Sequence, residues 1–521
     1  MGFNFVTSDC DQVFLLPPDT RDWLPEGHLA WEIVTVVERL EFSAFLACYR
    51  TDGQGRPAYH PKTMVALVLY CYCKGIRSSR AIQMACFDDV GARVITGNRQ
   101  PDHATIARFV KRHAAAVKQL FVQVLTVCAK DGLVQVDLVA GDGTKVKANA
   151  SKATSMTVEQ LDIKIEELEA ALAAEVQAWL EQADAQDAEQ DALFTHDCDG
   201  ARTPSAGSRL VRKRTAEKLA RGKAAKRILQ QRHGDTTGAG PAIKDKRARA
   251  TAAKERLEQV TAEQLAKVAR HRRREEIKAV GGKADSGRPP LPVDQSPKVL
   301  AARAGLKIAE GALHRAEADP NKGAVPKGNI TDSASRIMPA KTGGYVQGYN
   351  AQALATANQI ILAIGTHDNP TDVGALHPLL RQAHANLDAA AITEKIGKAL
   401  FDAGYASGEN FTTDTTVDLH VSVHNESAQT GRQDATTKTM PTGWHEMAER
   451  MSSDEATQLY KQRSAIIEPV FAQLFARLRR HLHYRANMVD VELHLWALTH
   501  NLLKRIRLIA KQATAATSPT A

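Results

Sequence analysis

The hydrophobic pattern of the first quarter of the chain predicts helices. Between residues 58 and 130, apolar residues recur every three or four positions, which is the spacing of one buried face of an α-helix. Residue types that start and stop helices divide this stretch into three. The predicted helices run from Pro61 to Gly75, from Ser78 or Ser79 to near Gly97, and from the N-cap Asp102 to Gly132.

The third predicted helix carries candidate DNA contacts. Three helices in this order resemble a helix-turn-helix, whose last helix enters the major groove of DNA. Polar and basic side chains occupy the first turns of this helix: Thr105, Arg108, Lys111 and Arg112. A plain helical bundle would show the same pattern, so both interpretations stay open.

From Leu133 the pattern changes to short β-branched runs, and LVQVDLVAGDG (133–143) is predicted to form a strand. After Thr331 the chain is predicted to form two strands, a helix, a strand and two helices, at 344–355, 359–369, 373–390, 395–407, 460–480 and 491–511. This order predicts an α/β fold with a ribonuclease-H-like catalytic core, a long helical insertion after the first strand, and an all-helical N-terminal domain.

The insertion is helical and strongly charged. Residues 158–182 and 250–276 have heptad-like spacing, and we expect them to pair as a helical hairpin. Residues 151–200 are acidic, whereas 201–280 carry an excess of Lys and Arg. The basic arm is a candidate nucleic-acid surface that the acidic segment shields in the free protein, although a solvated helical arm explains the same composition.

Gly, Pro and Ser at 281–297 indicate a linker. The predicted domains are a helical, helix-turn-helix-like DNA-binding domain (1–130), the first strand of the core (131–150), the charged helical insertion and linker (151–325), the remainder of the core (326–512) and a disordered tail (513–521).

The composition of the chain excludes few classes of protein. The net charge of +9 permits a polyanionic partner without requiring one. We find neither a run of apolar residues long enough for a membrane helix nor an export signal at the N-terminus. The 7 cysteines show no paired zinc-ligand spacing, which favours reduced thiols in a cytoplasmic protein.

Three acids are candidates for metal-dependent chemistry. Asp142 follows the first predicted strand between two glycines, Asp402 follows a later strand, and Glu468 precedes Pro469 at or near a predicted helix start. Carboxylate oxygens are hard ligands that suit Mg²⁺ or Mn²⁺. Two such ions about 4 Å apart can activate a water or a 3′-hydroxyl for phosphodiester displacement. The structural alternative is a turn or cap residue for each Asp and a solvent-facing helix residue for Glu468.

Other acids of the predicted core are expected to have structural roles. These are Asp332, Asp368 and Asp372, and Asp332 is the best candidate for an exception.

Several motifs together resemble the DDE transposases of bacterial insertion sequences. They occur in order over roughly 55–510: YHPKTMVALVLYCYCKGIRSSRAI, GDGTKVKANAS, TDSASRIM, GYNAQ, LFDAGYAS, YKQRSAIIEPVFAQL and THNLLKRIR. The chain is similar to the IS-four/IS-five superfamily, and most similar to the IS-eleven-eighty-two group.

The resemblance implies roles for particular residues. Asp142, Asp402 and Glu468 would be the catalytic acids and metal ligands, with two Mg²⁺ or Mn²⁺ ions. Lys145 and Lys147 would face phosphates, although solvated lysines would look identical.

Residues of the third motif have implied roles as well. Tyr460 and Arg463 would orient the transposon end. The family often has a Lys seven residues after the Glu, where this chain has Phe475; Arg477 or Arg479 would then contact a phosphate instead.

The resemblance also implies the activity and the partners. The protein would bind terminal inverted repeats and target DNA as a homodimer or larger assembly, cut the 3′ ends and join them to the target. It would act in the bacterial cytoplasm, at the nucleoid when bound to DNA. Two alternatives stay open: an element-derived DNA-binding protein or repressor without catalysis, and a metal-dependent nuclease that cleaves without joining.

Overall fold

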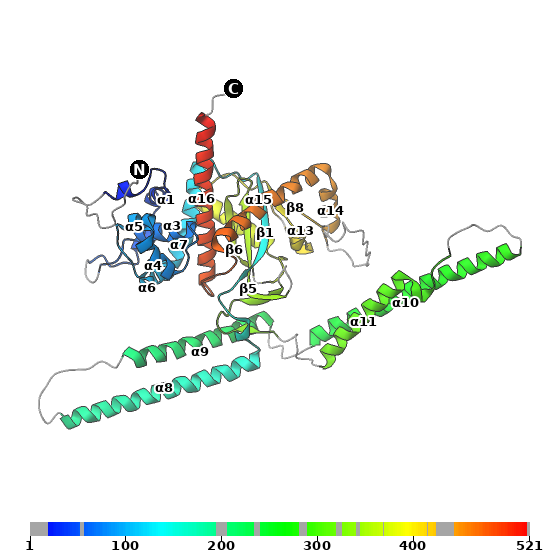
Figure 1. The fold of residues 1–521 in the computed structure, drawn as a ribbon, viewed down its shortest axis with the longest axis horizontal. Coiled ribbons are helices and arrows are strands. Elements are labelled where there is room, and N and C mark those ends of the chain that lie inside the picture. The colour runs from blue at the N-terminus through cyan, green and yellow to red at the C-terminus, as the bar shows by residue number, and fades with distance from the viewer. Residues whose placement is uncertain are drawn as a thin grey trace, which may run out of the picture. The chain divides into compact units, whose positions relative to one another are not determined.

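The computed structural model describes most of the chain as two compact units. The described residues are 19–52, 57–193, 206–233, 240–280, 289–318, 326–339, 344–367, 369–413, 415–423 and 442–517. One unit comprises residues 1–154 together with 331–521, and the other comprises 155–330. The fold of the first unit is mixed α/β (Figure 1).

The first unit begins with short helices rather than the three expected ones. They are α1 (Leu29–Glu38), α2 (Ser43–Leu46), α3 (Pro61–Cys73), α4 (Ser79–Asp88), α5 (Val90–Thr96), α6 (His103–Arg112) and α7 (Ala114–Lys130). The start of α3 at Pro61 is confirmed, as are the N-caps Ser78 of α4 and Asp102 of α6.

The prediction that the second and third helices are continuous was wrong. Each is divided in two by a residue whose side chain has partners of its own. Asp89 is extended and caps α5 through Ala92 N–H, while it also accepts a hydrogen bond from Tyr70 Oη at 2.8 Å. His113 ends α6, and its buried ring lies 3.1 Å from the hydroxyl of Tyr49.

The predicted strands form one mixed sheet in the order β6–β5–β1–β7–β8, and β4 pairs with the start of β5. The strands are β1 (Leu138–Lys147), β4 (Arg336–Pro339), β5 (Tyr345–Thr356), β6 (Ile361–His367), β7 (Lys398–Phe401) and β8 (Asp418–Val421). β5 runs antiparallel to β1 and β6, whereas β1, β7 and β8 are parallel. The sequence analysis did not identify β4 or β8.

Helices cover the sheet and complete the first unit. They are α12 (Leu376–Ala389), α13 (Gly408–Thr412), α14 (Trp444–Ser452), α15 (Asp454–Leu478) and α16 (Met488–Thr517). α12 packs on β5 and β6, and α15 packs on β1, β5 and β7. α16 continues through Thr517, so helix replaces the first part of the expected tail, while 518–521 lie outside the described residues.

The second unit contains the charged insertion, but its helices pair differently from the prediction. They are α8 (Val158–Leu193), α9 (Ala206–His233), α10 (Gly240–Ala279) and α11 (Pro297–Ala318), with the short strands β2 (Ser155–Met156) and β3 (Gly328–Asn329). α8 pairs with α9, and α10 pairs with α11 (Figure 1). The expected pairing of 158–182 with 250–276 was therefore wrong.

Charge and chain proximity explain the observed pairing of α8 with α9. Acids of α8 face lysines of α9, with Glu169 at 2.6 Å from Lys223 and Asp162 at 2.5 Å from Lys226. Sequence neighbours also pair at a lower entropic cost than distant segments. Part of the basic arm is thus paired with the acidic segment, as the shielding hypothesis supposed. Residues 281–288 of the predicted linker lie outside the described residues.

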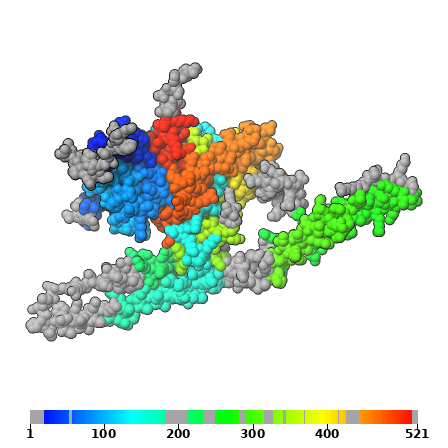
Figure 2. Space-filling view, viewed as in Figure 1, coloured from blue at the N-terminus to red at the C-terminus, as the bar shows by residue number. Residues whose placement is uncertain are grey.

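One continuous hydrophobic core joins the N-terminal helices to the sheet. α16 packs against α3, α7 and β6, and Figure 2 shows the atoms of the N-terminal helices (blue) meeting those of α15 and α16 (orange to red). No helix in the described part of the chain combines the length and the apolar character that crossing a bilayer requires.

A buried ion pair crosses this core. Arg77 Nη1 lies 3.2 Å from Glu492 Oε1, and the two side chains are 4% and 0% exposed. Glu492 also accepts hydrogen bonds from the backbone N–H groups of His483 and Tyr484, each at 2.9 Å. Burial raises the pKa of the Glu492 carboxyl, which shows how strongly this group depends on its partners.

We predict that Glu492→Ala lowers the free energy of unfolding by about 3–5 kcal/mol, because it leaves a buried guanidinium without its counter-ion and two N–H groups without their acceptor. Urea denaturation followed by circular dichroism measures the change. Glu38→Ala, an exposed acid on α1, is the control and should change stability by less than about 0.5 kcal/mol. Equal stabilities for the two variants would contradict the prediction.

Candidate active site

The candidate site lies where β7 leaves β1. The parallel pairing covers only Leu138 to Ala140, and its last pair is Ala140 with Leu400. Continuing this register by two residues brings Asp142 opposite Asp402. The prediction that the first strand ends at Asp142 was wrong, because β1 stays paired with β5 as far as Lys147. Asp142 instead lies within β1, at the edge that β7 leaves open.

The two glycines beside Asp142 are required by close neighbours. A Cβ atom on Gly141 would lie 2.2 Å from the ring of Phe401. A Cβ atom on Gly143 would lie 2.3 Å from Asp372 Oδ1 and 2.4 Å from Gln352 Nε2. Both distances are too short for a side chain, so the glycines let β1 pack directly against these groups.

Glu468 was predicted to lie at or near the start of a helix. It lies instead in the interior of one. α15 begins after the N-cap Ser453 and contains Pro469 at an interior position. A proline there removes one backbone hydrogen bond and costs about 3 kcal/mol. Burial of neighbouring apolar residues, such as Ile467 and Val470, offsets this cost. The helix thereby carries Tyr460, Arg463 and Glu468 together.

Arg463 shows that the three predicted acids converge. Its Nη1 atom lies 3.8 Å from Asp142 Oδ2, and the side chain is 14% exposed. Burial alone would lower the pKa of this guanidinium. Its pKa is nevertheless above the ordinary value because of four nearby groups: Tyr460, Asp142, Asp402 and Glu468. The guanidinium of Arg463 also lies 5.9 Å from the ring centroid of Tyr460.

A further acid, Asp372, which was expected to have a structural role, lies in the same region. Burial raises the pKa of the Tyr405 hydroxyl, and three carboxylates raise it further: Asp372, Asp142 and Asp402. Asp372 had no distinguishing local sequence signal, because it follows a short loop after β6 rather than a strand directly. Asp368 lies outside the described residues.

The donor chemistry of the three acids suits a divalent ion. Their carboxylate oxygens are the ligands that Mg²⁺ prefers, and Mg²⁺ usually retains several waters as well. Within the ranges that the structure describes, no three His, Cys, Asp or Glu side chains are close enough to form a metal site by themselves. The acids therefore fit a metal by chemistry and by their shared neighbour Arg463.

The two lysines after Asp142 lie in different surroundings. Lys145 Nζ is 3.9 Å from Asp372 Oδ1, within the candidate site. Lys147 instead lines a groove of about 1030 Å³, together with Lys152, His481 and Arg485. None of the described residues lining this groove is acidic.

The charge of this groove comes from Lys and Arg. Burial lowers the pKa of His481, and the charges of Arg77, Arg479 and Lys147 lower it further. Both effects favour the neutral form of His481. The groove presents a cationic surface beside the end of β1, which suits a polyanion.

The predicted contacts on α6 lie mostly at the surface. Arg108, Lys111 and Arg112 are exposed, whereas Thr105 is half-buried and donates its hydroxyl to Asp102 at 2.7 Å. The guanidinium of Arg112 stacks 4.9 Å from the ring centroid of Tyr49. Their role in DNA binding stays a prediction.

The basic residues near Phe475 differ in exposure. The Nε and Nη2 atoms of Arg477 are buried and have no hydrogen-bond partner among the residues that the structure describes, and burial lowers the pKa of this guanidinium. Arg479 and Arg480 are exposed, and Arg480 lies 4.5 Å from the ring centroid of Phe475. Phosphate contact by Arg477 stays a prediction, and in this structure its side chain is half-buried.

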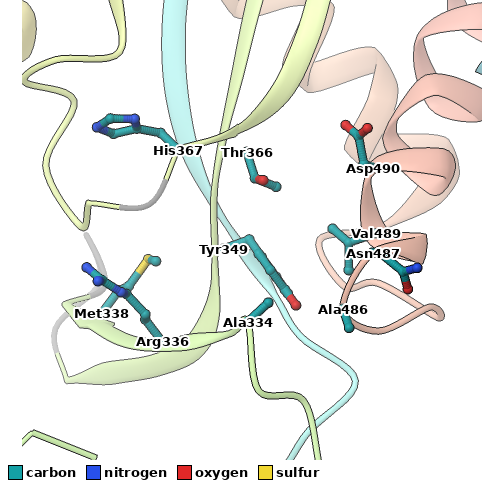
Figure 3. A pocket seen from close by; sticks show the side chains of 10 residues that line it. All are labelled: Ala334, Arg336, Met338, Tyr349, Thr366, His367, Ala486, Asn487, Val489 and Asp490. Carbon is teal, nitrogen blue, oxygen red and sulfur yellow. The ribbon is translucent and has the colours of Figure 1, made fainter. Parts of the chain in front are cut away.

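A second, smaller pocket lies away from the predicted acids (Figure 3). It has a volume of about 190 Å³ and is lined by residues of β4, β5, β6 and the start of α16, including Tyr349, His367 and Asp490. Asp332 is buried beside Tyr349. It accepts a hydrogen bond from the Tyr349 hydroxyl at 2.6 Å and another from the Ala486 N–H at 3.0 Å. Asp332 thus holds a loop, which agrees with a structural role.

Comparisons with known families identify the protein family. Residues 18–112 match a transposase domain family (DUF772), and residues 320–502 match the transposase DDE domain. The second match includes Asp402 and Glu468, while Asp142 lies outside both. No curated protein and no solved structure gives a significant match. The chain belongs to the DDE transposases of insertion sequences, enzymes that cut DNA and transfer the cut strands.

Proposed function

We propose that Asp142, Asp402 and Glu468 are the catalytic acids of this transposase. The observation that carries the proposal is their convergence: all three raise the pKa of Arg463 at the point where β7 leaves β1. DDE transposases depend on a divalent metal ion, generally Mg²⁺. We propose that the three carboxylates hold two such ions, which supply Lewis-acid activation of the attacking oxygen and stabilise the leaving one.

The strand order supports a ribonuclease-H-like core. Three antiparallel strands (β6, β5, β1) followed by two parallel ones (β7, β8) form the sheet, and α12 connects the two parts. In this proposal, the first strand is followed by the insertion of about 151–325 and the core resumes near 326. The helices before residue 131 form the DNA-binding region.

The chain's own residues have distinct tasks in the proposed reaction. Arg463 lies beside Asp142, where it balances the repulsion among the acids and can orient a phosphate. Tyr460 lies against Arg463 and limits its movement. The hydroxyl of the cut 3′ end would attack target DNA in line, with both DNA ends held in a dimer or larger assembly.

We propose that DNA runs over the cationic groove as well as α6. Lys147, Lys152 and Arg485 would contact phosphates, and α6 would read the terminal inverted repeat. We propose that the reaction takes place in the cytoplasm, at the nucleoid during transposition.

We predict that Asp142→Asn, Asp402→Asn and Glu468→Gln each reduce strand cleavage with Mg²⁺ by roughly 100-fold or more, because each removes a negative ligand from the reacting centre. The measurement is excision and joining of a marker flanked by the element's ends on a plasmid, with and without EDTA. Asp388→Ala, an exposed acid on α12, is the control.

The products distinguish this proposal from its alternatives. Cleavage without joining in the wild type would indicate a nuclease, and end binding without cleavage would indicate a DNA-binding protein. Full activity in any of the three acid variants would remove that residue from the proposed triad.

We predict that Lys147→Ala and Lys152→Ala each reduce the slope of log affinity against log salt by about one, because each removes one phosphate contact. Fluorescence anisotropy with labelled duplex DNA at several salt concentrations measures the slope. Lys130→Ala, an exposed lysine at the end of α7, should leave it unchanged. Unchanged slopes in both groove variants would place the DNA elsewhere.

A further inference from the structure

Asp372 is held by two buried amides of the central strand β5. Its Oδ1 atom accepts hydrogen bonds from Asn350 Nδ2 at 2.8 Å and from Gln352 Nε2 at 2.7 Å. Asn350 is 0% exposed and Gln352 is 3% exposed, so these amides have no access to bulk solvent. Asn350 also donates to the carbonyls of Asn369 and Thr371, which fixes the loop that carries Asp372.

The same carboxylate contacts the first catalytic motif. Gln352 pairs with Gly143 across the β1–β5 ladder, and Asn350 pairs with Lys145. Gly143 has no room for a side chain because Asp372 and Gln352 fill that position. Successive residues of a strand face opposite sides, so Asp372 supports β1 from the side opposite the Asp142 side chain.

Asp372 also contacts the second catalytic motif. A Cβ atom on Gly404 would lie 2.9 Å from Asp402 Oδ1 and 3.3 Å from Asp372 Oδ2, so both carboxylates face this glycine. Tyr405, which is 0% exposed, donates its hydroxyl to Gln352 Oε1. A chain of hydrogen bonds therefore runs from Asp372 through Gln352 to the turn that follows Asp402.

We propose that Asp372 is a positioning residue of the active site, whose carboxylate joins β1, β5 and the 402–405 turn and thereby sets the separation of Asp142 and Asp402. This inference rests on the proposed role of those two acids. It explains why a glycine follows Asp142 and why Gly404 and Tyr405 follow Asp402: all three positions accommodate Asp372 or its partner Gln352.

Charge adds to this role. Lys145 Nζ, at 3.9 Å, partly balances Asp372, so the additional acid does not simply increase repulsion at the site. Loss of the carboxylate would leave the amides of Asn350 and Gln352 without their shared acceptor and release Lys145. Both changes loosen β1 relative to the turn after β7.

Divalent-ion affinity of the full-length protein without DNA tests this proposal. The measurement is the loss of the free Mn²⁺ electron paramagnetic resonance signal on titration, with thermal unfolding followed in parallel. We expect Asp372→Ala to weaken Mn²⁺ binding by about 10-fold, the size typical of groups that orient metal ligands. Asp372→Asn should weaken it less, because its amide oxygen still accepts from β5.

Two further variants make the outcome decisive. Tyr405→Phe removes only the hydroxyl and should also weaken Mn²⁺ binding, so it and Asp372→Asn carry the test if Asp372→Ala does not fold. Asp388→Ala is the matched control and should bind Mn²⁺ as the wild type does.

Asp142→Asn separates the two ways of failing. If Asp142→Asn weakens Mn²⁺ binding while Asp372→Ala, Asp372→Asn and Tyr405→Phe do not, the positioning role is overturned and the proposed triad stands. If Asp142→Asn binds Mn²⁺ as tightly as the wild type, the proposed metal site fails, and the positioning role fails with it.

Discussion

Repulsion among carboxylates is the constraint on which this site depends. Asp142, Asp402 and Glu468 act on one guanidinium, and Asp372 is held just behind them. Like charges this close are stable only with cations nearby. Arg463 supplies one from α15 and Lys145 another from β1, and both side chains are mostly buried. If these acids form the proposed site, they would be held in place before any ion or DNA arrives, and the energetic cost of assembling them would be met during folding.

The sequence predicted the longer helices and strands better than their boundaries and interruptions. β5, β6, β7, α12, α15 and α16 were expected from the hydrophobic pattern, whereas the short strands β4 and β8 were not identified. The divisions at Asp89 and His113 depend on side-chain partners distant in sequence, which periodicity does not report. Pro469 was misleading because its local preference for a helix start is overridden by tertiary packing.

The candidate site, too, could be predicted only in part from the sequence. The acids could be proposed from motifs, and the glycines beside Asp142 indicated close approach without revealing what approaches. The answer is Phe401 at Gly141, and Asp372 with Gln352 at Gly143. These neighbours come from segments more than 200 residues away, so only the assembled fold brings them together. In the same way, Lys145 and Lys147 look equivalent in sequence, yet one lies beside Asp372 and the other lines a cationic groove.

The chain leaves the first unit after Thr154 and re-enters it at Thr331, and these two residues are neighbours in space. Thr331 donates its hydroxyl to that of Thr154 at 3.2 Å, and these residues stand at the two ends of everything between 155 and 330. Two ends this close can be joined by a tight turn of a few residues. The catalytic sheet is therefore topologically complete without the charged helices, and the intervening segment is a natural position for exchange, shortening or replacement by a different module.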